Sequence, residues 1–355
     1  MSSLVDLRRF SLPELESMVA ERGLPAFRYR QMARWLYGKA AASIDEMTDL
    51  SLDLRTELSR DYEVGGLEVV AERTSQVDRT RKFLFRLQDG RSVESVLMPL
   101  GRRYTLCISS QVGCTLDCVF CDTGRMGFLR NLEAWEIVGQ VIPLWREIRA
   151  ERDDKVRTNI VFMGMGEPLH NTDAVIEACR LLTDPLGLHL RPKGITVSTA
   201  GGIAGMRKLA DSGLGVRLAV SLNATTQEER ERLMPKAAKV PLLELVAAAR
   251  DYAERTNDRA TMEYVLMRGV NDRPEDADRL GDLFRGGPFK INLIPYNPGG
   301  NGQLERPDRE AVDAFARRLY PQAPVVTVRW SMGPDIAAAC GQLKTEVERT
   351  TPPAA

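Results

Sequence analysis

CISSQVGCTLDCVFCDTGRMGFLRN, residues Cys107–Asn131, holds four of the six cysteines of this chain. Cys114, Cys118 and Cys121 follow the spacing C-x3-C-x2-C within it. A structural zinc site usually takes four ligands from two separated pairs, and this sequence has no second pair. Three thiolates in one short loop fit a 4Fe–4S cluster that keeps one iron free of protein ligands, where a small molecule can bind. The alternative is three buried cysteines without a cofactor.

The composition is typical of a globular protein with one large and one small domain: 355 residues, 28% charged and 43% hydrophobic. No apolar run approaches the ~20 residues that span a membrane. The first residues contain no apolar signal core, so we expect a cytoplasmic protein whose thiols stay reduced. The formal net charge is zero, so any basic surface for nucleic acid must be local.

Residues 1–62 predict a small helical domain. Ser11 is suited to cap a helix with Pro13 in its first turn and Glu14 at the capping-box position. Gly23 and Pro25 end that helix, and further helices are expected at 29–37 and 51–61.

One segment of this domain is both basic and aromatic. Guanidinium groups grip phosphates and aromatic rings stack on unpaired bases, which would suit RNA. The rings could equally belong to the core and the arginines to a solvated face, and the sequence leaves both readings open. The residues are Arg22, Phe27, Arg28, Tyr29, Arg30, Arg34, Trp35, Tyr37 and Lys39.

Residues 63–103 predict a linker of β-strands, because apolar and polar residues alternate around an Asp89-Gly90 turn. Glu94 falls in the middle of one such strand. A carboxylate at that position usually faces outward.

Residues 104–345 alternate short apolar segments with helical ones, which predicts a parallel sheet with right-handed crossovers. We expect an α/β fold, a partial (β/α)6-type barrel, with chemistry at the carboxyl ends of the strands. Residues 346–355 are expected to form a flexible tail. The predicted strands are 105–109, 159–163, 194–198, 216–222, 262–266, 290–294 and 325–328, and the predicted helices are 132–149, 172–184, 202–212, 226–233, 241–255, 275–286 and 307–319.

Small and polar residues follow these strands. Gly164 and Gly166 would let the backbone approach a ligand closely, and Glu167 would present a carboxylate that suits an ammonium group. Taken singly, each is more typical of a turn or helix cap, but as a ring around one mouth they suit a nucleotide-like cofactor. The others are Ser198, Ser221, Asn223 and Asn297.

Together these motifs resemble the RlmN/Cfr family of radical S-adenosylmethionine (SAM) RNA methyltransferases. These enzymes methylate adenine in ribosomal RNA and, for some members, transfer RNA. The likeness covers nearly the whole chain. The matching motifs are YRQMARWLYGK, SIDEMTDLS, TRKFLFRLQDGRSVESVLMP, CISSQVGCTLDCVFCDTGRMGFLRNL, MGMGEPL, GITVSTAGG, LAVSLNA with ERLMP, EYVLMRGVND, INLIPYNP and CGQL.

The resemblance implies a radical SAM barrel and a role for each matching residue. Cys114, Cys118 and Cys121 would ligate the cluster. Cys340 would carry a methyl group, Cys107 would resolve the intermediate by forming a disulfide, and Glu94 would accept a proton. The residues implied to contact SAM are Gly166, Glu167, Ser198, Ser221, Asn223 and Asn297.

The implied reaction uses two SAM molecules per turnover, because an adenine ring carbon has no lone pair with which to attack a methyl group. One SAM methylates Cys340, which must react as a thiolate. A second is cleaved to a radical that activates the S-methyl group for addition to the ring. Attack by Cys107 on the sulfur of Cys340 then releases the product. The resemblance also implies an electron donor such as flavodoxin or ferredoxin.

Carbon 2 of an adenosine in 23S rRNA is the expected target, with transfer RNA as a second candidate. The alternatives are carbon 8, another RNA or a small molecule, and a non-catalytic RNA-binding role. Some residues depart from the family pattern and bear on the substrate more than on the chemistry. They are Asn223, where His is usual, Tyr296, where Trp or Phe is usual, and Trp330, Met332 and Pro334 before Cys340.

Overall fold

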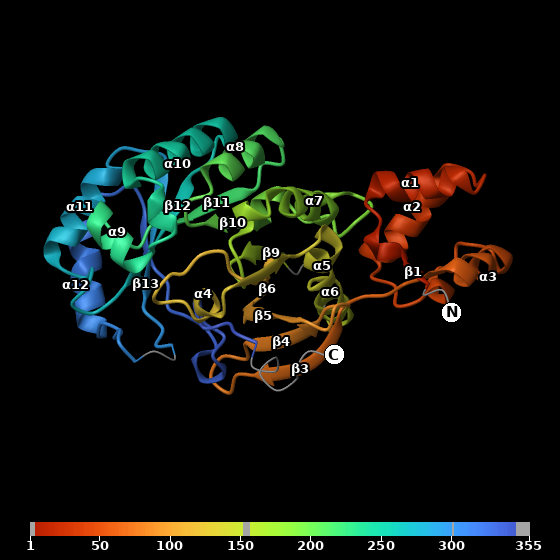
Figure 1. The fold of residues 1–355 in the computed structure, drawn as a ribbon, viewed down its shortest axis with the longest axis horizontal. Coiled ribbons are helices and arrows are strands. Elements are labelled where there is room, and N and C mark those ends of the chain that lie inside the picture. The colour runs from red at the N-terminus through yellow and green to blue at the C-terminus, as the bar shows by residue number, and fades with distance from the viewer. Residues whose placement is uncertain (1–3, 152–156, 300–301, 346–355) are drawn as a thin grey trace.

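The computed structural model describes residues 4–151, 157–299 and 302–345. A small helical domain lies at one end of the molecule, beside a larger body of one sheet covered by helices (Figure 1). The tail predicted at 346–355 lies outside the described residues. None of the helices in the described ranges is long and apolar enough to cross a membrane.

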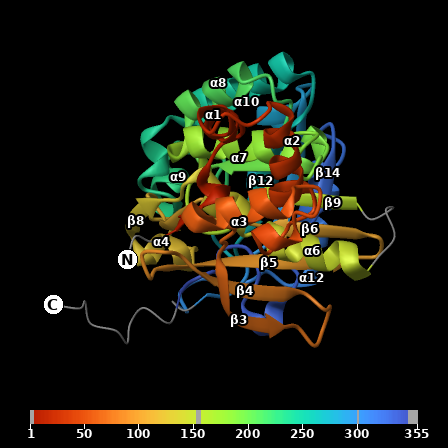
Figure 2. The ribbon, with the colours of Figure 1, turned by 90° about the vertical axis from the view of Figure 1, so that its right-hand side faces the viewer.

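The N-terminal domain has the predicted helices. Ser11 caps α1 (Leu12–Glu21) and forms a capping box with Glu14, as expected. α2 begins earlier than predicted, at Phe27–Ala33, and continues as a π-helical turn, Arg34–Gly38. α3 spans Leu52–Asp61. Two short parallel strands close the domain: β1 (Val5–Asp6) and β2 (Tyr62–Glu63). Figure 2 shows these helices together at the end that faces the viewer.

The basic and aromatic segment divides between core and surface. Tyr37 is buried and donates a hydrogen bond to the Phe10 carbonyl. Trp35 is half-buried, with its indole N–H bonded to Asp49 and Lys39 3.4 Å from its ring centre. The Phe27 ring, by contrast, is 54% exposed. The segment is therefore partly structural, and Phe27 with its neighbours forms its exposed part.

The ten-stranded sheet runs in the order β14-β13-β12-β11-β10-β9-β6-β5-β4-β3. Its strands from β14 to β6 are parallel, and the two ends of the sheet do not pair with each other within the described residues, so the barrel is partial, as predicted. The parallel strands are β6 (Arg103–Cys107), β9 (Arg157–Phe162), β10 (Ile195–Thr199), β11 (Arg217–Ser221), β12 (Ala260–Leu266), β13 (Phe289–Pro295) and β14 (Val326–Val328).

The strands predicted as a linker extend this same sheet. β3 (Glu68–Thr74), β4 (Arg81–Arg86) and β5 (Ser92–Leu100) are antiparallel neighbours, and β5 pairs with β6 so that Val96 lies opposite Cys107. The turn between β4 and β5 contains Gly90 at φ +81°, as the Asp-Gly signal predicts. The sheet is therefore continuous from the N-terminal hairpins into the barrel.

Helices on the outer face follow the parallel strands, and their apolar faces cover the sheet (Figure 1). The single helix predicted at 132–149 is wrong: the chain forms α5 (Ala134–Gly139) and α6 (Ile142–Glu151). Pro143 lacks an N–H and favours the first turn of a new helix. The other helices are α7 (Thr172–Thr183), α8 (Ile203–Asp211), α9 (Gln227–Leu233), α10 (Leu242–Thr256), α11 (Pro274–Phe284) and α12 (Arg309–Leu319).

The cysteine loop follows β6 and is closed by elements that the sequence did not predict. β7 (Gln111–Gly113) pairs with β8 (Phe128–Asn131), and α4 (Asp122–Met126) lies between them. Gly113 has φ +74°, and a Cβ atom there would lie 1.8 Å from the carbonyl oxygen of Gly127. This crossing of backbones fixes the base of the loop.

We predict that Gly113→Ala destabilises the protein far more than Gly90→Ala. Both glycines have positive φ, which costs an alanine about 1 kcal/mol. A Cβ at Gly90 meets nothing within 4 Å, whereas one at Gly113 displaces backbone, at a further cost of about 2 kcal/mol or more. Denaturant unfolding of the two variants measures this difference. Equal losses of unfolding free energy would contradict the close backbone contact between Gly113 and Gly127.

Candidate active site

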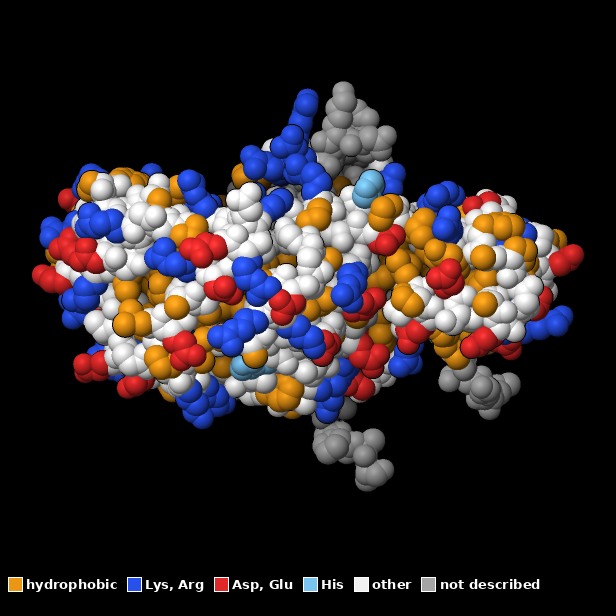
Figure 3. Space-filling model, turned by 90° about the horizontal axis from the view of Figure 1, so that it is seen from above, with side chains coloured by type: hydrophobic (Ala, Val, Ile, Leu, Met, Phe, Trp, Pro, Cys, Tyr) orange, Lys and Arg blue, Asp and Glu red, His pale blue; other side chains and the backbone are white. Residues whose placement is uncertain are grey.

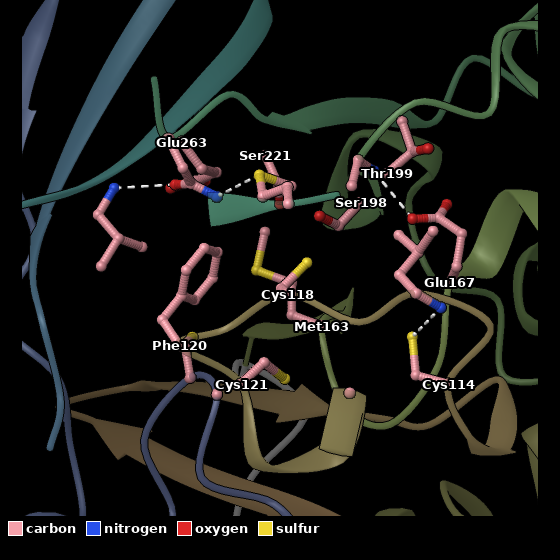
Figure 4. A pocket seen from close by; sticks show the side chains of 18 of the residues that line it. Cys114, Cys118, Phe120, Cys121, Met163, Glu167, Ser198, Thr199, Ser221 and Glu263 are labelled. Atoms are coloured by element: carbon pink, nitrogen blue, oxygen red, sulfur yellow. Dashed lines mark hydrogen bonds between the residues drawn. The ribbon is translucent and has the colours of Figure 1, made fainter. Parts of the chain in front are cut away.

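One cavity of about 980 Å³ opens at the carboxyl ends of the parallel strands. Ten predicted site residues line it, namely the nine predicted ligands of the cluster and SAM and the predicted methyl carrier Cys340, and Figure 4 shows several of them facing its interior. They are Cys114, Cys118, Cys121, Gly166, Glu167, Ser198, Ser221, Asn223, Asn297 and Cys340. We call it the first cavity.

The three loop cysteines lie on one side of this cavity (Figure 4). Burial raises the pKa of the Cys114 thiol to about 12 and raises those of Cys118 and Cys121. Such thiols need a strong Lewis acid to ionise them, and bound iron supplies one. Within the described ranges no three Cys, His, Asp or Glu side chains gather closely enough for a single metal ion. The donor set itself, three thiols in C-x3-C-x2-C spacing that line one cavity, fits the three protein ligands of a 4Fe–4S cluster.

The MGMGEPL segment packs against the start of the cysteine loop. A Cβ on Gly164 would lie 2.7 Å from the Ile108 backbone, and one on Gly166, at φ +105°, 2.6 Å from Gln111. We expected these two glycines to let the backbone approach a ligand closely. In the structure they let it pack closely against Ile108 and Gln111 of the protein. The Glu167 carboxylate accepts hydrogen bonds from the N–H groups of Leu169 (3.1 Å) and Ala200 (2.8 Å), which hold it at the cavity wall.

Asn223, which stands where histidine is usual, is held by its backbone conformation and by its side-chain contacts. Its backbone lies at φ +58°, a left-handed conformation that asparagine tolerates well. Its side-chain oxygen accepts a 3.0 Å bond from the N–H of Val265, and its amide group lies 3.5 Å from the Met234 sulfur. The amide thus fixes the wall of the first cavity between β11 and β12.

The segment 329–345 brings Cys340 to the first cavity. Asn297, after β13, donates to the Ser331 hydroxyl (2.8 Å) and contacts the Cys340 carbonyl (3.4 Å). The Asp122 N–H donates to the Gly341 carbonyl (2.7 Å), which joins this segment to the cysteine loop. Cys340 is held there by bonds from two directions.

A second cavity, of about 1360 Å³, lies beyond Cys340. Cys107 forms part of its wall, with Arg329 and the departing residues Trp330 and Met332. Cys340, Met163 and Ile294 line both cavities and so form the boundary between them. The Cys340 side chain is exposed to these cavities, whereas Cys107 is buried in the wall. All six cysteines are free thiols.

Opposite charges flank the Cys340 thiol. Although Cys340 is accessible from the cavities, the protein around its thiol displaces water and raises its pKa; the Arg329 guanidinium opposes that rise, and the Glu263 carboxylate adds to it. Burial also raises the pKa of Cys107 to about 12, with a further rise from Cys340. Glu263 itself is buried on β12, bonded to Asn292 at 3.0 Å through one oxygen, while the other has no partner. Glu263 thus lines the first cavity with one carboxylate oxygen that is buried and has no hydrogen-bond partner.

Glu94 does not face outward. Its carboxylate pairs with Lys82 at 3.1 Å and accepts a 2.8 Å bond from the N–H of Lys344, and both members of the ion pair are buried. These three residues line a third cavity of about 590 Å³, next to Ala337. Lys82 also reaches the Ala337 carbonyl, so the pair holds the segment that carries Cys340.

Sequence reasoning missed Glu263, Arg329 and Lys82. A charged residue inside an apolar strand, as in Thr261–Leu266, is a signal that could have identified Glu263. Arg329 and Lys82 carried no such signal, because their partners are distant in sequence.

Two family models match the chain: the Radical SAM superfamily over residues 108–280, and the ribosomal RNA large subunit methyltransferase N-terminal domain over residues 5–64. The fold and the three-cysteine loop therefore define a radical SAM enzyme. A crystal structure of a radical SAM methyltransferase from Sphaerobacter thermophilus is similar, with a TM-score of 0.90 and 42% identity, covering 96% of this chain and 99% of that one.

Curated relatives give the narrower class. The chain is 45% identical over 345 residues to the dual-specificity RNA methyltransferase RlmN of Geotalea uraniireducens, covering 97% of this chain and 98% of the relative. It is 46% identical to that of Geobacter sulfurreducens, covering 99% and 95%. The chain belongs to the RlmN family of radical SAM RNA methyltransferases. Membership implies an iron–sulfur cluster and SAM as cofactors.

We predict that Lys82 and Glu94 are energetically coupled. Lys82→Met leaves a buried carboxylate without its cation and costs about 3 kcal/mol of unfolding free energy. The double variant Lys82→Met/Glu94→Gln removes both charges and recovers most of that loss. Arg255→Met, which breaks an exposed pair with Asp211, is the control and should change the unfolding free energy little, because solvent screens that pair. Additive losses in denaturant unfolding would disprove the coupling.

The charges around Cys340 predict opposite effects on its alkylation. A raised pKa leaves less thiolate at a given pH, so iodoacetamide should modify Cys340 more slowly than a free cysteine. Glu263→Gln removes a negative neighbour and should speed the reaction, while Arg329→Gln should slow it. Mass spectrometry of the Cys340 peptide over a pH series measures both, and shifts of the same sign would contradict the arrangement.

Proposed function

We propose that this enzyme methylates carbon 2 of an adenosine in 23S ribosomal RNA in the cytoplasm, with transfer RNA as a second substrate. The position of Cys340 carries the proposal: an exposed thiol stands between a cavity lined by the cluster and SAM residues and a cavity walled by a second thiol. The relatives named as dual-specificity RNA methyltransferases and the match to a ribosomal RNA large subunit methyltransferase N-terminal domain support an RNA substrate.

In this proposal the first cavity holds the cofactors. Cys114, Cys118 and Cys121 ligate a 4Fe–4S cluster, which with SAM and one electron from a donor such as flavodoxin or ferredoxin supplies a hydrogen-abstracting radical. Two SAM molecules are used per turnover, the first as methyl donor. The residues that orient SAM are Gly166, Glu167, Ser198, Ser221, Asn223 and Asn297.

The remaining roles fall to Cys340 and Cys107, which line the second cavity, and to Glu94, which lines the third. The Cys340 thiolate accepts the methyl group and presents it to the adenine, so that enzyme and RNA become linked through one carbon. Cys107 then attacks the Cys340 sulfur, forming a transient disulfide and freeing the methylated base. Glu94 accepts the proton that leaves the ring carbon, a role that suits a carboxyl whose pKa burial raises.

RNA is held partly by the exposed portion of the N-terminal segment. Phe27 offers a ring for stacking, and its neighbour Arg28 lies 4.9 Å from the centre of that ring. Elsewhere basic and acidic side chains are interspersed, as Figure 3 shows for one face. Local contacts of this kind suit a chain whose formal net charge is zero.

We predict that the reconstituted enzyme forms 2-methyladenosine in a 23S rRNA fragment and in transfer RNA. Nuclease digestion and mass spectrometry against 2-methyl and 8-methyl standards identify the product. Cys340→Ala should abolish the product, while Cys179→Ala, which removes a buried thiol of α7, should retain it. Transfer to carbon 8 alone would refute the regiochemistry.

Cys107→Ala should trap the enzyme on its substrate. Without the second thiol the link between Cys340 and adenine cannot be resolved, so a stable protein–RNA adduct accumulates. Denaturing gels with labelled RNA detect it, and digestion names the nucleotide. If Cys107→Ala turned over normally and left no adduct, the resolving role would be wrong.

A further inference from the structure

Arg230 on α9 is the largest side chain that is fully buried in the described chain. Its Nη1 donates to the Leu222 carbonyl at 2.9 Å, and its Nη2 donates to the Ala200 carbonyl. These carbonyls follow β11 and β10. The guanidinium therefore lies at the carboxyl ends of two neighbouring barrel strands, at the back of the first cavity.

The charge of Arg230 has no carboxylate partner. Among the ion pairs formed within residues 4–151, 157–299 and 302–345, none includes Arg230, and its Nε is buried without a hydrogen bond. Burial lowers its pKa to about 10, so the group stays charged at neutral pH. A buried charge is strongly destabilising unless an opposite charge compensates it. Neutral carbonyls supply only part of that compensation.

The cysteine loop is the negative partner within reach. Cys118, the neighbour of Val119, lines the first cavity together with Ala200 and Met234, and both of these contact the Arg230 guanidinium. The Val119 N–H donates a 3.0 Å bond to the carbonyl of Leu233, which ties the loop to the helix that carries Arg230. Met234, next along the chain, lines the first cavity and lies 4.0 Å from the Nη1 of Arg230.

We propose that Arg230 is the counter-charge of the iron–sulfur cluster, a positioning residue that stabilises the thiolate ligands and favours the one-electron-reduced form. The proposal rests on the proposed cluster. Three thiolates outweigh the charge of an oxidised 4Fe–4S core, and reduction by one electron from the donor adds a further negative charge. A fixed cation nearby stabilises the reduced form more and so raises the reduction potential.

A purely structural role would instead need only the hydrogen bonds to the two carbonyls. Two substitutions separate these roles. Arg230→Gln keeps an N–H donor and loses the charge. Arg230→Lys keeps the charge but loses the planar guanidinium group that donates to both carbonyls. Arg232→Gln, exposed on the same helix, is the matched control.

The test is potentiometric EPR titration of each anaerobically reconstituted protein, with iron release to a chelator as a second readout. Arg230→Gln should lower the midpoint potential and lose iron about tenfold faster or more. Arg230→Lys should restore most of the potential, and Arg232→Gln should match the unsubstituted enzyme.

The proposal is overturned if Arg230→Gln keeps the potential of the unsubstituted enzyme, or if Arg230→Lys and Arg230→Gln are equally shifted. Should Arg230→Gln fail to fold, Arg230→Lys still decides, because a potential well below that of the unsubstituted enzyme would refute a charge effect. Failure of the proposed function gives different results. If the unsubstituted protein binds no iron, the proposed cluster is wrong. If its product is not 2-methyladenosine, the proposed regiochemistry is wrong but the role of Arg230 is unaffected.

Discussion

The hydrogen bond from the Asp122 N–H to the Gly341 carbonyl is the contact on which the site depends. It joins the cysteine loop to a segment that lies more than two hundred residues later in the chain. A parallel bond from the Thr123 hydroxyl to the Leu343 carbonyl, at 2.6 Å, reinforces it. These contacts hold the segment of Cys340, which has little regular structure of its own, against the cysteine loop.

The same segment is anchored on its other side by the hairpin of β3 and β4. The Asp335 carboxylate accepts bonds from the Ser75 hydroxyl (2.6 Å) and the Gln76 N–H (2.9 Å), and the Gly333 N–H donates to Asp78 at 2.8 Å. The antiparallel strands therefore do more than link two domains. They complete the wall against which the methyl-carrying thiol is proposed to work.

Local patterns predicted most of the fold, because apolar strands, capped helices and the C-x3-C-x2-C spacing are properties of neighbouring residues. Strand ends in a parallel sheet converge, which explains why the six predicted SAM residues line one cavity with the cysteine loop; Cys340 was placed there only by the family resemblance. It failed where partners are distant: the burial of Glu94 depends on Lys82 one strand away, and the charges around Cys340 come from β12 and from Arg329 after β14. The break between α5 and α6 was missed although Pro143 signalled it.

The central claim is that Cys340, and not Cys107, receives a methyl group through the first cavity. The most direct measurement is peptide mass spectrometry of the reconstituted enzyme after incubation with methyl-labelled SAM and a reductant, without RNA. The account predicts the label on Cys340, whose side chain is exposed to that cavity, and none on the buried Cys107. A label on Cys107, or an unlabelled Cys340 in protein that contains its cluster, would contradict it.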